Sequence, residues 1–405
     1  MWSDEGGRPR VVVTGMGLAS PLGAEVETFW ERLTAGTVAT GPVTRFPTDG
    51  YPTHRAAEVD DPVLTAPDTP DGRGTPRAVR YVSHSAARAL GDAKLLPGAD
   101  PRRVGIVVGT VMGTRPHLEE LRRQGRGLDT DRSWDEPALL ADLPAHEFGL
   151  RGPRHVVAAG CAAGNTAIAT AADCIRFGEA DAMVAAGVDE LSQAVFRLFT
   201  ALRALAPDEV RPFDRDRQGM MPSEAGAVLV LESLEHAVAR GATILAELRG
   251  YAVAADAHHM TAPHPQGAGM LRCMRESLDQ AGLAPGDVDY VSAHGTGTPA
   301  NDTLEAAGIA EFFHRHGRRP AVSSIKGMLG HSQGGASLLE AVACVLAVQH
   351  GRVPGNPTLR EPEDGCAELD LVTGPARDLP VKVALSNAFG FGGNTATVVF
   401  GRYPG

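Results

Sequence analysis

The sequence lacks several features that mark common classes of protein. Its five cysteines are an odd number, are widely spaced and include no Cys-x-x-Cys pair, which argues against a disulfide framework and a zinc site. No stretch approaches the ~18 uninterrupted apolar residues of a membrane-spanning helix. The polar N-terminal segment MWSDEGGRPR has no apolar core of a secretion signal. We therefore expect a cytoplasmic protein with reduced thiols and no membrane contact.

An excess of positive charge is also missing. The chain has 38 Lys+Arg against 49 Asp+Glu, a formal net charge of -11, so nucleic acid is not an expected partner. Hydrophobic residues make up 43% and charged residues 21% of the 405 residues, which is ordinary globular usage. This length predicts two or three domains, or one large duplicated α/β body.

Short β-branched runs that end at glycine predict buried strands. They are RVVVTGMG from Arg10, VGIVVGT from Val104, HVVAAG from His155, AMVAAGV from Ala182, AVLVLE from Ala227, DYVSAHG from Asp289 and VALSNAFG from Val383. Between them, Ala- and Leu-rich segments predict helices at 165–177, 270–281, 304–313 and 337–349. Alternation of strand and helix predicts mostly parallel sheets with helices on their faces.

Two parts of the sequence share one plan. AARALGDAKLLPGADPRRVGIVVGT and MRESLDQAGLAPGDVDYVSAHGT each predict a helix, an apolar turn with Pro and Asp, and a strand that ends in Gly-Thr. A second strand and an Ala-rich helix follow each copy. We infer a duplicated α/β body with halves at 1–250 and 251–405, although chance repetition of strand-turn-helix order is an alternative.

Cys161 is the candidate nucleophile. In AAGCAAGNTA it lies between an apolar strand end and a helix, where free backbone N–H groups favour a thiolate. A partly buried helix terminus contributes up to ~2 kcal/mol, which predicts a thiol that is about half ionised at pH 7. The amide of Cys161 itself could supply one oxyanion donor. The alternative is a buried structural cysteine, which is our interpretation of Cys174 and Cys344.

Three further candidates follow predicted strands, where open α/β sheets bind ligands. His294 lies in AHGTGTPAND, and Lys326 and His331 lie in SSIKGMLGHSQGG, with His331 opening the helix that contains Glu340. Lysine occurs only three times in the chain, which favours a specific role for a compact ammonium group at Lys326. The alternatives are a loop-packing histidine and an ordinary surface lysine.

Two other motifs contain residues that could bind a ligand. NAFGFGGNTA places Phe389 and Phe391 in a Gly-rich turn after a strand, where a backbone N–H could be the second oxyanion donor. Ordinary packing is the alternative for these phenylalanines. DAHHMTAPHP is rich in histidine, but its spacing fits no recognised zinc site, so we expect no metal.

The order and spacing of one cysteine, two histidines, one lysine and a terminal GFGG turn resemble the β-ketoacyl synthases of the thiolase superfamily. The resemblance extends from VVVTGMGLASPLG through RPFDRDRQGM, AHGTGTPAND and SSIKGMLGH to NAFGFGGN. It is strongest to the free-standing enzymes of bacterial fatty-acid and type II polyketide synthesis. It implies a five-layer αβαβα fold with two pseudo-symmetric halves. Two segments depart from the family pattern: MPSEAGA replaces a GEGA-like segment, and HSQGGAS replaces an HSLGAAG-like one.

The resemblance also implies roles for single residues. Cys161 would be the acylated nucleophile, His294 and His331 would face the malonyl unit, and Lys326 would position and polarise His331. The amides of Cys161 and Phe391 would form the oxyanion hole. The remaining implied residues are Thr296 and Thr298 for the phosphopantetheine arm, Glu305 and Glu340 as supporting acids, Phe199, Phe389 and Phe391 for substrate contact, and Arg203 for a carrier-protein contact.

The implied activity is condensation of a Cys-bound acyl group with malonyl carried by an acyl carrier protein. The resemblance implies no external cofactor, because the phosphopantetheine belongs to the carrier protein. It implies a homodimer or a heterodimer with a chain-length-factor-like homologue. Two alternatives remain at this point: a Cys-dependent hydrolase or acyltransferase on the same scaffold, and a non-catalytic chain-length partner subunit.

Overall fold

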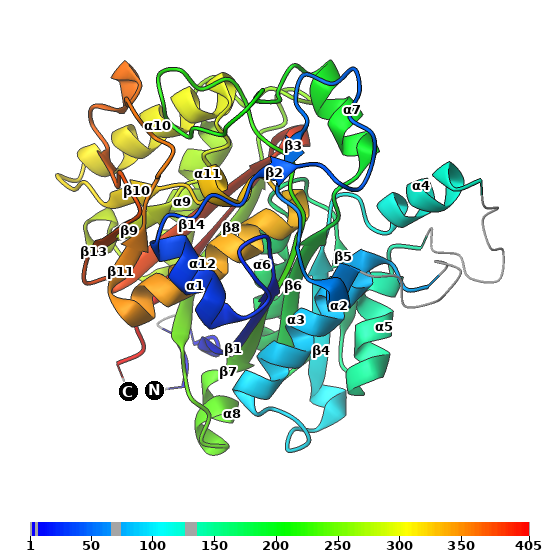
Figure 1. Cartoon of the computed structure of the whole chain (residues 1–405). Coiled ribbons are helices and arrows are strands. Elements are labelled where there is room, and N and C mark those ends of the chain that lie inside the picture. Colours follow the sequence, from blue (N-terminus) through cyan, green and yellow to red (C-terminus); the bar gives the residue numbers. More distant parts are fainter. Residues whose placement is uncertain (1, 5–6, 66–73, 126–135, 405) are drawn as a thin grey trace.

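The computed structural model describes residues 2–4, 7–65, 74–125 and 136–404 (Figure 1). Its N-terminal part contains β1 (Val11–Ala19), α1 (Val26–Thr34), β2 (Gly41–Pro42), β3 (Arg55–Ala56), α2 (Pro62–Thr65), α3 (Arg77–Ala93), β4 (Val104–Gly109), α4 (Arg115–Arg123), α5 (Leu139–Phe148), β5 (Arg154–Val157), α6 (Ala163–Arg176), β6 (Ala182–Asp189), α7 (Gln193–Ala201), β7 (Ala225–Ser233) and α8 (Leu234–Ala239).

The C-terminal part repeats much of this order. It contains β8 (Ala246–Ala255), α9 (Ala268–Ala281), β9 (Tyr290–Ser292), α10 (Pro299–His314), β10 (Ala321–Ser323), α11 (Lys326–Leu329), α12 (Ala336–His350), β11 (Arg352–Pro354), β12 (Asp370–Leu371), β13 (Ala376–Asp378), β14 (Val383–Gly390) and β15 (Asn394–Gly401). All seven strands and all four helices expected from the sequence are therefore confirmed, with shifted ends.

The main sheet is built from two sets of strands with the same connections. Its order across the described residues is β12-β10-β9-β14-β15-β8-β1-β7-β6-β4-β5. Reading outward from the centre, β1, β7, β6, β4 and β5 correspond to β8, β15, β14, β9 and β10, and each matching pair of neighbours has the same direction. The two sets meet where β1 pairs antiparallel with β8.

Helices cover the sheet in layers (Figure 1). The outer helix α3 packs on β1 and β7, and the outer helix α9 packs on β8 and β15. Between the two sets of strands, α6 and α12 contact each other and strands of both sets. Nearly every residue of α12 is buried, as expected for an apolar helix inside a large core. This arrangement is the five-layer αβαβα fold that the resemblance implied.

The internal similarity of the sequence corresponds to this repeated topology. The first copy forms α3, a short 3₁₀ turn at Pro101–Arg103 and β4, and the second forms α9, a matching turn at Pro285–Asp287 and β9. The boundary expected between residues 250 and 251 lies inside β8. The first set of repeated elements therefore ends before the connection at 240–245, and the second set begins with β8.

The expectation of mostly parallel sheets is wrong. The pairs β1 with β7, β6 with β7, β1 with β8, β8 with β15 and β14 with β15 are all antiparallel. For β14 and β15 the physical reason is local, because they form a hairpin through the GFGG turn, which needs no crossover helix. The other four pairs join strands that no tight turn connects. Strand β10 is the second strand expected after Thr296, whereas β8 and β15, which also carry buried residues, are not among the expected strands.

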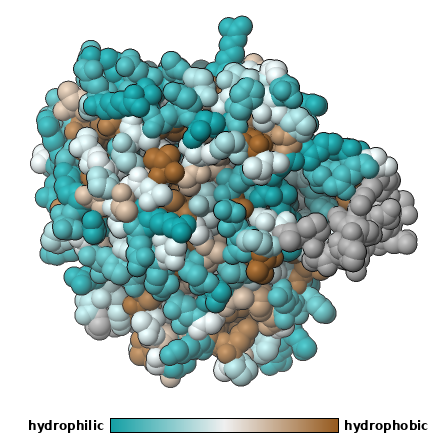
Figure 2. Space-filling model, in the orientation of Figure 1, coloured by the Kyte–Doolittle hydropathy of each residue, from teal (hydrophilic) through white to brown (hydrophobic). Residues whose placement is uncertain are grey.

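On the face shown in Figure 2, hydrophilic residues predominate and hydrophobic ones form small separate patches. Among the residues that the structure describes, no helix is long and apolar enough to cross a membrane.

The departure MPSEAGA places Glu224 in the interior, just before β7. Its carboxylate pairs with Arg45 and Arg77 and accepts the N–H groups of Val59 and Leu191 at 3.1 and 3.2 Å. Burial raises the pKa of this carboxyl, but the charges of Arg77 and Arg45 outweigh burial and leave the pKa below its ordinary value. Glu224 therefore fixes segments from several parts of the chain around one buried charge.

We predict that Glu224→Gln lowers the free energy of unfolding at pH 7 by about 3 kcal/mol, because it removes the carboxylate that pairs with the largely buried Arg45 and one of the two carboxylates that pair with Arg77. The difference should shrink as the pH falls below the unfolded-state pKa of glutamate, ~4.3, where the wild-type carboxylate also loses its charge. Urea denaturation measures both effects. Glu235→Gln on exposed α8 is the control, and an equal loss in both variants would contradict the prediction.

Candidate active site

One cavity of about 370 Å³ brings together residues from both halves of the chain. Of the residues singled out in the sequence, those lining it are Cys161, Phe199, Arg203, His294, Thr296, Thr298, Glu305, His331, Phe389 and Phe391. Lys326 and Glu340 lie behind this lining, fully buried. The cavity is therefore formed where β9, β14 and the segment before α6 end on the same side of the sheet.

The Cys161 thiol is more buried than the sequence indicated. The residue is 9% exposed and precedes α6, which begins at Ala163. Burial raises the pKa of Cys161 to about 12, and the charge of Lys326 lowers it only in part. The expectation of a thiol half ionised at pH 7 is therefore wrong, because removal from water outweighs the favourable charge of Lys326 and the backbone hydrogen bond at the thiol. The resting site contains a protonated thiol.

Lys326 is the centre of a buried polar cluster. Its ammonium group pairs with Glu340 on α12, donates to the His294 carbonyl oxygen at 2.6 Å and donates to His294 Nδ1 at 3.3 Å. The resemblance implied that Lys326 would position His331. In the described part of the chain its hydrogen bonds go to His294 and Glu340 instead, because Lys326 begins α11 directly beside the end of β9.

His294 and His331 are both neutral and both have the proton on Nε2. Burial and the Lys326 charge lower the pKa of each imidazole well below its ordinary value. An ammonium group and a backbone N–H can only donate, so Nδ1 of His294 accepts from Lys326 and Nδ1 of His331 accepts from the Gln333 N–H at 3.2 Å. The rings lie 5.4 Å apart, edge to face. The cavity is therefore lined by two imidazoles, each with one N–H donor.

The GFGG turn lies against the segment that carries Cys161. A Cβ atom added at Gly390 would lie 2.7 Å from the Cys161 nitrogen, and one added at Gly160 would lie 3.3 Å from the Phe391 nitrogen. Gly160 also has φ +54°, which favours glycine. The two amides proposed for an oxyanion hole are thus brought together by glycines that permit this close approach.

The HGTGT turn after β9 is held by a buried carboxylate. Glu305 on α10 accepts the N–H groups of His294 and Gly295, each at 2.7 Å, and burial raises its pKa to about 7. The hydroxyls of Thr296 and Thr298 lie 2.8 Å apart and both residues face the cavity. Glu305 therefore fixes the backbone of His294, while the threonine hydroxyls remain beside the cavity.

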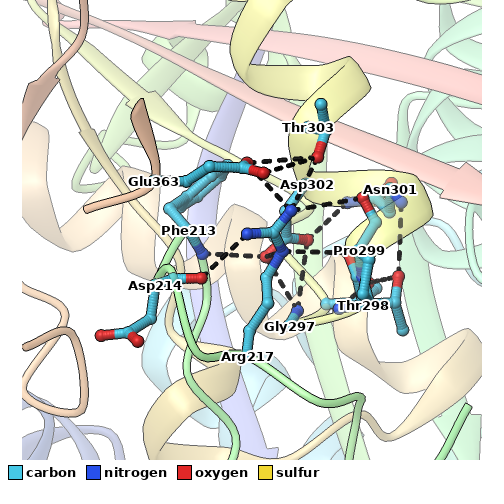
Figure 3. Close-up of polar contacts among 12 residues, drawn as sticks. Phe213, Asp214, Arg217, Gly297, Thr298, Pro299, Asn301, Asp302, Thr303 and Glu363 are labelled. Atoms are coloured by element: carbon cyan, nitrogen blue, oxygen red, sulfur yellow. Dashed lines mark hydrogen bonds and ion pairs between the residues drawn. The ribbon is translucent and has the colours of Figure 1, made fainter. Parts of the chain in front are cut away.

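A second polar network, which the sequence did not predict, supports the HGTGT turn after β9 (Figure 3). The Asp302 carboxylate accepts N–H groups of Phe213 and Gly297. Arg217, almost fully buried, donates to Thr303 and pairs with Glu363 at 2.9 Å. Both motifs, RPFDRDRQGM and AHGTGTPAND, were noted in the sequence, but nothing in them showed that their charged residues meet.

Aromatic and basic residues form the outer part of the cavity. Phe199 and Phe391 lie 5.9 Å apart, and Phe389 packs edge to face on His294 at 5.5 Å. Arg203 follows α7 at the mouth of the cavity, is exposed, and forms no ion pair with the described residues. The three phenylalanines and Arg203 therefore line the same cavity, with Phe391 and Arg203 exposed to solvent.

The His-rich segment that begins at Asp256 is a surface loop beside the GFGG turn. His259 Nδ1 accepts local backbone N–H groups of its own loop, and the Met260 carbonyl accepts the Gly392 N–H at 2.8 Å. No group of three or more His, Cys, Asp or Glu side chains suited to a metal occurs among the described residues. The contact with Gly392 links this loop to the turn that carries the Phe391 amide.

Comparisons with known proteins show which family the whole chain matches. Residues 8–237 match the model of the beta-ketoacyl synthase N-terminal domain, and residues 245–360 match that of the C-terminal domain. The chain is 38% identical to 3-oxoacyl-[acyl-carrier-protein] synthase 2 of Coxiella burnetii over 97% of this chain and 98% of that protein.

Two solved structures are similar over nearly their whole length. The ishigamide ketosynthase/chain length factor has a TM-score of 0.88 and 38% identity, with 98% of this chain and 100% of that chain covered. A type II polyketide ketosynthase, bound to a hexaketide and in complex with its acyl carrier protein, has a TM-score of 0.88, 30% identity and the same coverage.

The buried thiol gives a testable pH dependence. Because the pKa of Cys161 is raised to about 12, alkylation of Cys161 by iodoacetamide should accelerate about tenfold for each pH unit between 7 and 10. Peptide mass spectrometry of the modified protein measures the rate at Cys161 itself. A rate that levels off near pH 8 would contradict the prediction, because it would show a thiol ionised at neutral pH.

Proposed function

The chain belongs to the beta-ketoacyl synthase family, and from this premise we propose that it is a 3-oxoacyl-[acyl-carrier-protein] synthase of type II fatty-acid or polyketide biosynthesis. The observation that carries the proposal is one cavity that contains a thiol and two neutral imidazoles. In each imidazole Nδ1 accepts a hydrogen bond from the protein, which leaves the Nε2–H group to donate to a substrate. A nucleophile and two N–H donors are what decarboxylative condensation requires.

The first step loads an acyl group on Cys161. The Sγ atom attacks the thioester carbonyl of an acyl carrier protein, and the amides of Cys161 and Phe391 donate to the oxyanion. The bond from carbonyl carbon to the carrier's sulfur then breaks, and the proton of Cys161 passes to that sulfur. Because one thiol replaces another, no net proton is released, and a thiol that is protonated at rest suits this exchange.

The second step makes the carbon nucleophile. The malonyl thioester loses CO₂, and the electron pair of the broken C–C bond forms an enolate whose oxygen accepts N–H groups from His294 and His331. The enolate carbon attacks the acyl-Cys161 carbonyl, the C–S bond breaks, and Cys161 takes up one proton from solvent. The product is a 3-oxoacyl thioester extended by two carbons. Since this balance needs no oxidant or reductant, we propose that no external cofactor takes part.

Lys326 supports this step indirectly. Its ammonium group holds the His294 carbonyl and Nδ1, so the proton of this neutral ring stays on Nε2, toward the malonyl oxygen. The same positive charge disfavours protonation of both imidazoles. Lys326 therefore acts as a positioning residue that keeps His294 a donor, with Glu340 balancing its charge.

We also propose the partners and location. The substrates are carried by an acyl carrier protein whose phosphopantetheine arm lies beside Thr296 and Thr298, and Phe199, Phe389 and Phe391 contact the acyl or malonyl unit. A similar ketosynthase named above was solved with its acyl carrier protein, which supports the carrier-protein partner. Another was solved as a ketosynthase/chain length factor, which supports a heterodimer with such a homologue, and a homodimer is the alternative. The absence of a spanning helix among the described residues is compatible with a cytoplasmic location.

The central test is incubation with acyl and malonyl carrier protein, followed by mass spectrometry of the carrier. Condensation adds two carbons, whereas a hydrolase releases free acid and a non-catalytic partner subunit does neither. We expect Cys161→Ser to lose elongation, because a hydroxyl has a far higher pKa than a thiol and is a poor acceptor of the acyl group. Persisting elongation by Cys161→Ser would show that the nucleophile is elsewhere.

His294 should separate the two half-reactions. We predict that His294→Ala still becomes acylated on Cys161, because thioester exchange is balanced in protons, but releases CO₂ from malonyl carrier protein at least about 100-fold more slowly, because the enolate loses a donor. Intact-protein mass spectrometry measures acylation and labelled malonyl measures CO₂. A folded variant that is not acylated would instead make His294 a base for Cys161.

Arg203 tests the docking of the carrier protein. Carrier proteins are typically acidic, and this chain has a net charge of -11, so docking needs a local basic site. We predict that Arg203→Glu lowers kcat/KM for carrier-bound substrates with little change in kcat, and that small thioesters still acylate Cys161 normally. The same charge change at Arg315, at the far end of α10, is the control. Wild-type carrier kinetics at low ionic strength would reject this docking site.

A further inference from the structure

We infer that Asp189, the last residue of β6, is a positioning residue for decarboxylation: its buried carboxylate ties the loop after β4 to the turn that follows His331. The inference rests on the proposed function and extends it to a residue that touches neither substrate nor either imidazole.

The Asp189 carboxylate is completely buried and fully occupied by donors. Its Oδ1 accepts the Thr110 hydroxyl and the Met112 N–H, both at 2.8 Å. Its Oδ2 accepts the Val111 N–H at 2.9 Å and the Gly334 N–H at 2.7 Å. Three of these donors belong to the loop directly after β4, and the fourth belongs to the turn between His331 and α12. One side chain thus joins segments more than 200 residues apart.

The turn held by Asp189 is strained and orients His331. Gln333 has φ +52°, a left-handed conformation that is costly for a residue with a side chain. The Gln333 N–H donates to His331 Nδ1, and the next N–H, of Gly334, donates to Asp189. Because these successive amides fix the turn, the Asp189 contact helps keep Nδ1 of His331 an acceptor and its proton on Nε2.

A carboxylate is needed at position 189 because four donors must be accepted by one side chain. Its two oxygens accept four donors, whereas an amide of the same size has one oxygen and adds two donors of its own. The charge has a cost, since burial raises the pKa of Asp189 to about 6 and the Asp189 charge raises the pKa of the nearby Cys161 thiol. The other charges acting on this thiol are Lys326, which lowers its pKa, and Glu340, which raises it.

These two effects make the role of Asp189 measurable. Asp189→Asn should slow decarboxylation of malonyl carrier protein at least about tenfold, because His331 loses its fixed turn. The same variant should speed alkylation of Cys161 by iodoacetamide at pH 8 about threefold or more, because a negative charge beside the thiol is gone. A loosened site would also speed alkylation, because Cys161 is only 9% exposed, so a second variant is needed to separate loss of the charge from loss of the geometry.

A second variant separates geometry from charge. A Cβ atom at Gly334 would lie 2.7 Å from Asp189 Oδ2, so Gly334→Ala moves the turn away from the carboxylate and keeps the charge. We expect decarboxylation to slow as in Asp189→Asn, with alkylation of Cys161 unchanged. This variant also keeps the proposal testable if Asp189→Asn does not fold.

The matched control is Glu232→Gln. Glu232 is a buried carboxylate that accepts the Thr14 hydroxyl, but it pairs with Ala182 at the opposite end of β6, roughly 23 Å from Asp189 at ~3.3 Å per residue. Glu232→Gln should keep the wild-type ratio of decarboxylation to alkylation.

Decarboxylation within about twofold of wild type in Asp189→Asn overturns the inference, as does an equal slowing in the control. Neither result affects the proposed function, which fails only if the wild-type chain does not extend acyl carrier protein.

Discussion

The buried ammonium group of Lys326 is the interaction on which the reaction centre depends. It joins the segment after β9, the start of α11 and the first half of α12 through His294 and Glu340. Moving an ammonium and a carboxylate out of water costs several kcal/mol for each ion. This cost is met only when the two are paired and hydrogen-bonded, as they are here. The position of His294 is therefore coupled to the packing of the central helix.

The charge of Lys326 also sets the state of its neighbours. It lowers the pKa of His294 and His331 beyond the effect of burial, and it opposes the rise in the pKa of Cys161. The same charge thus keeps two donors neutral and partly compensates for burial of the nucleophile. The duplicated fold makes this possible, because α6 and α12 form one shared layer and bring a thiol from one half beside imidazoles from the other.

Much of this arrangement was predictable from local sequence. Apolar runs ending at glycine identified seven strands, and the repeated plan before Thr110 and Thr296 identified the duplication, because each repeat is a continuous segment. The antiparallel pairing of β8 and β15 was not predictable in this way, since it depends on strands distant in sequence. Cys161, His294, Lys326 and His331 were identified by motifs, and the structure brings them together.

The contacts and pKa shifts that depend on burial were not predictable from the sequence. A helix terminus favours ionisation of Cys161, but the loss of water around the thiol is larger and appears only when the fold is assembled. The same holds for Lys326, which was expected beside His331 and lies beside His294. Asp189 is the last residue of β6, close in sequence to a strand end as the catalytic candidates are, yet only the fold shows that its four donors come from two loops.

The protonation states of the assembled site favour a reaction in which the thiol loses its proton only when a thioester substrate is bound. At rest the cavity contains a protonated thiol and two neutral imidazoles, so no strong base and no free nucleophile is exposed to water. Thioester exchange transfers the Cys161 proton to the departing carrier thiol, and only then does an acyl group occupy the nucleophile. Two N–H donors stabilise an enolate but do not generate a hydroxide ion from water. An acyl-enzyme in this cavity is therefore better protected from hydrolysis than one beside a histidine base, which is consistent with condensation rather than hydrolysis.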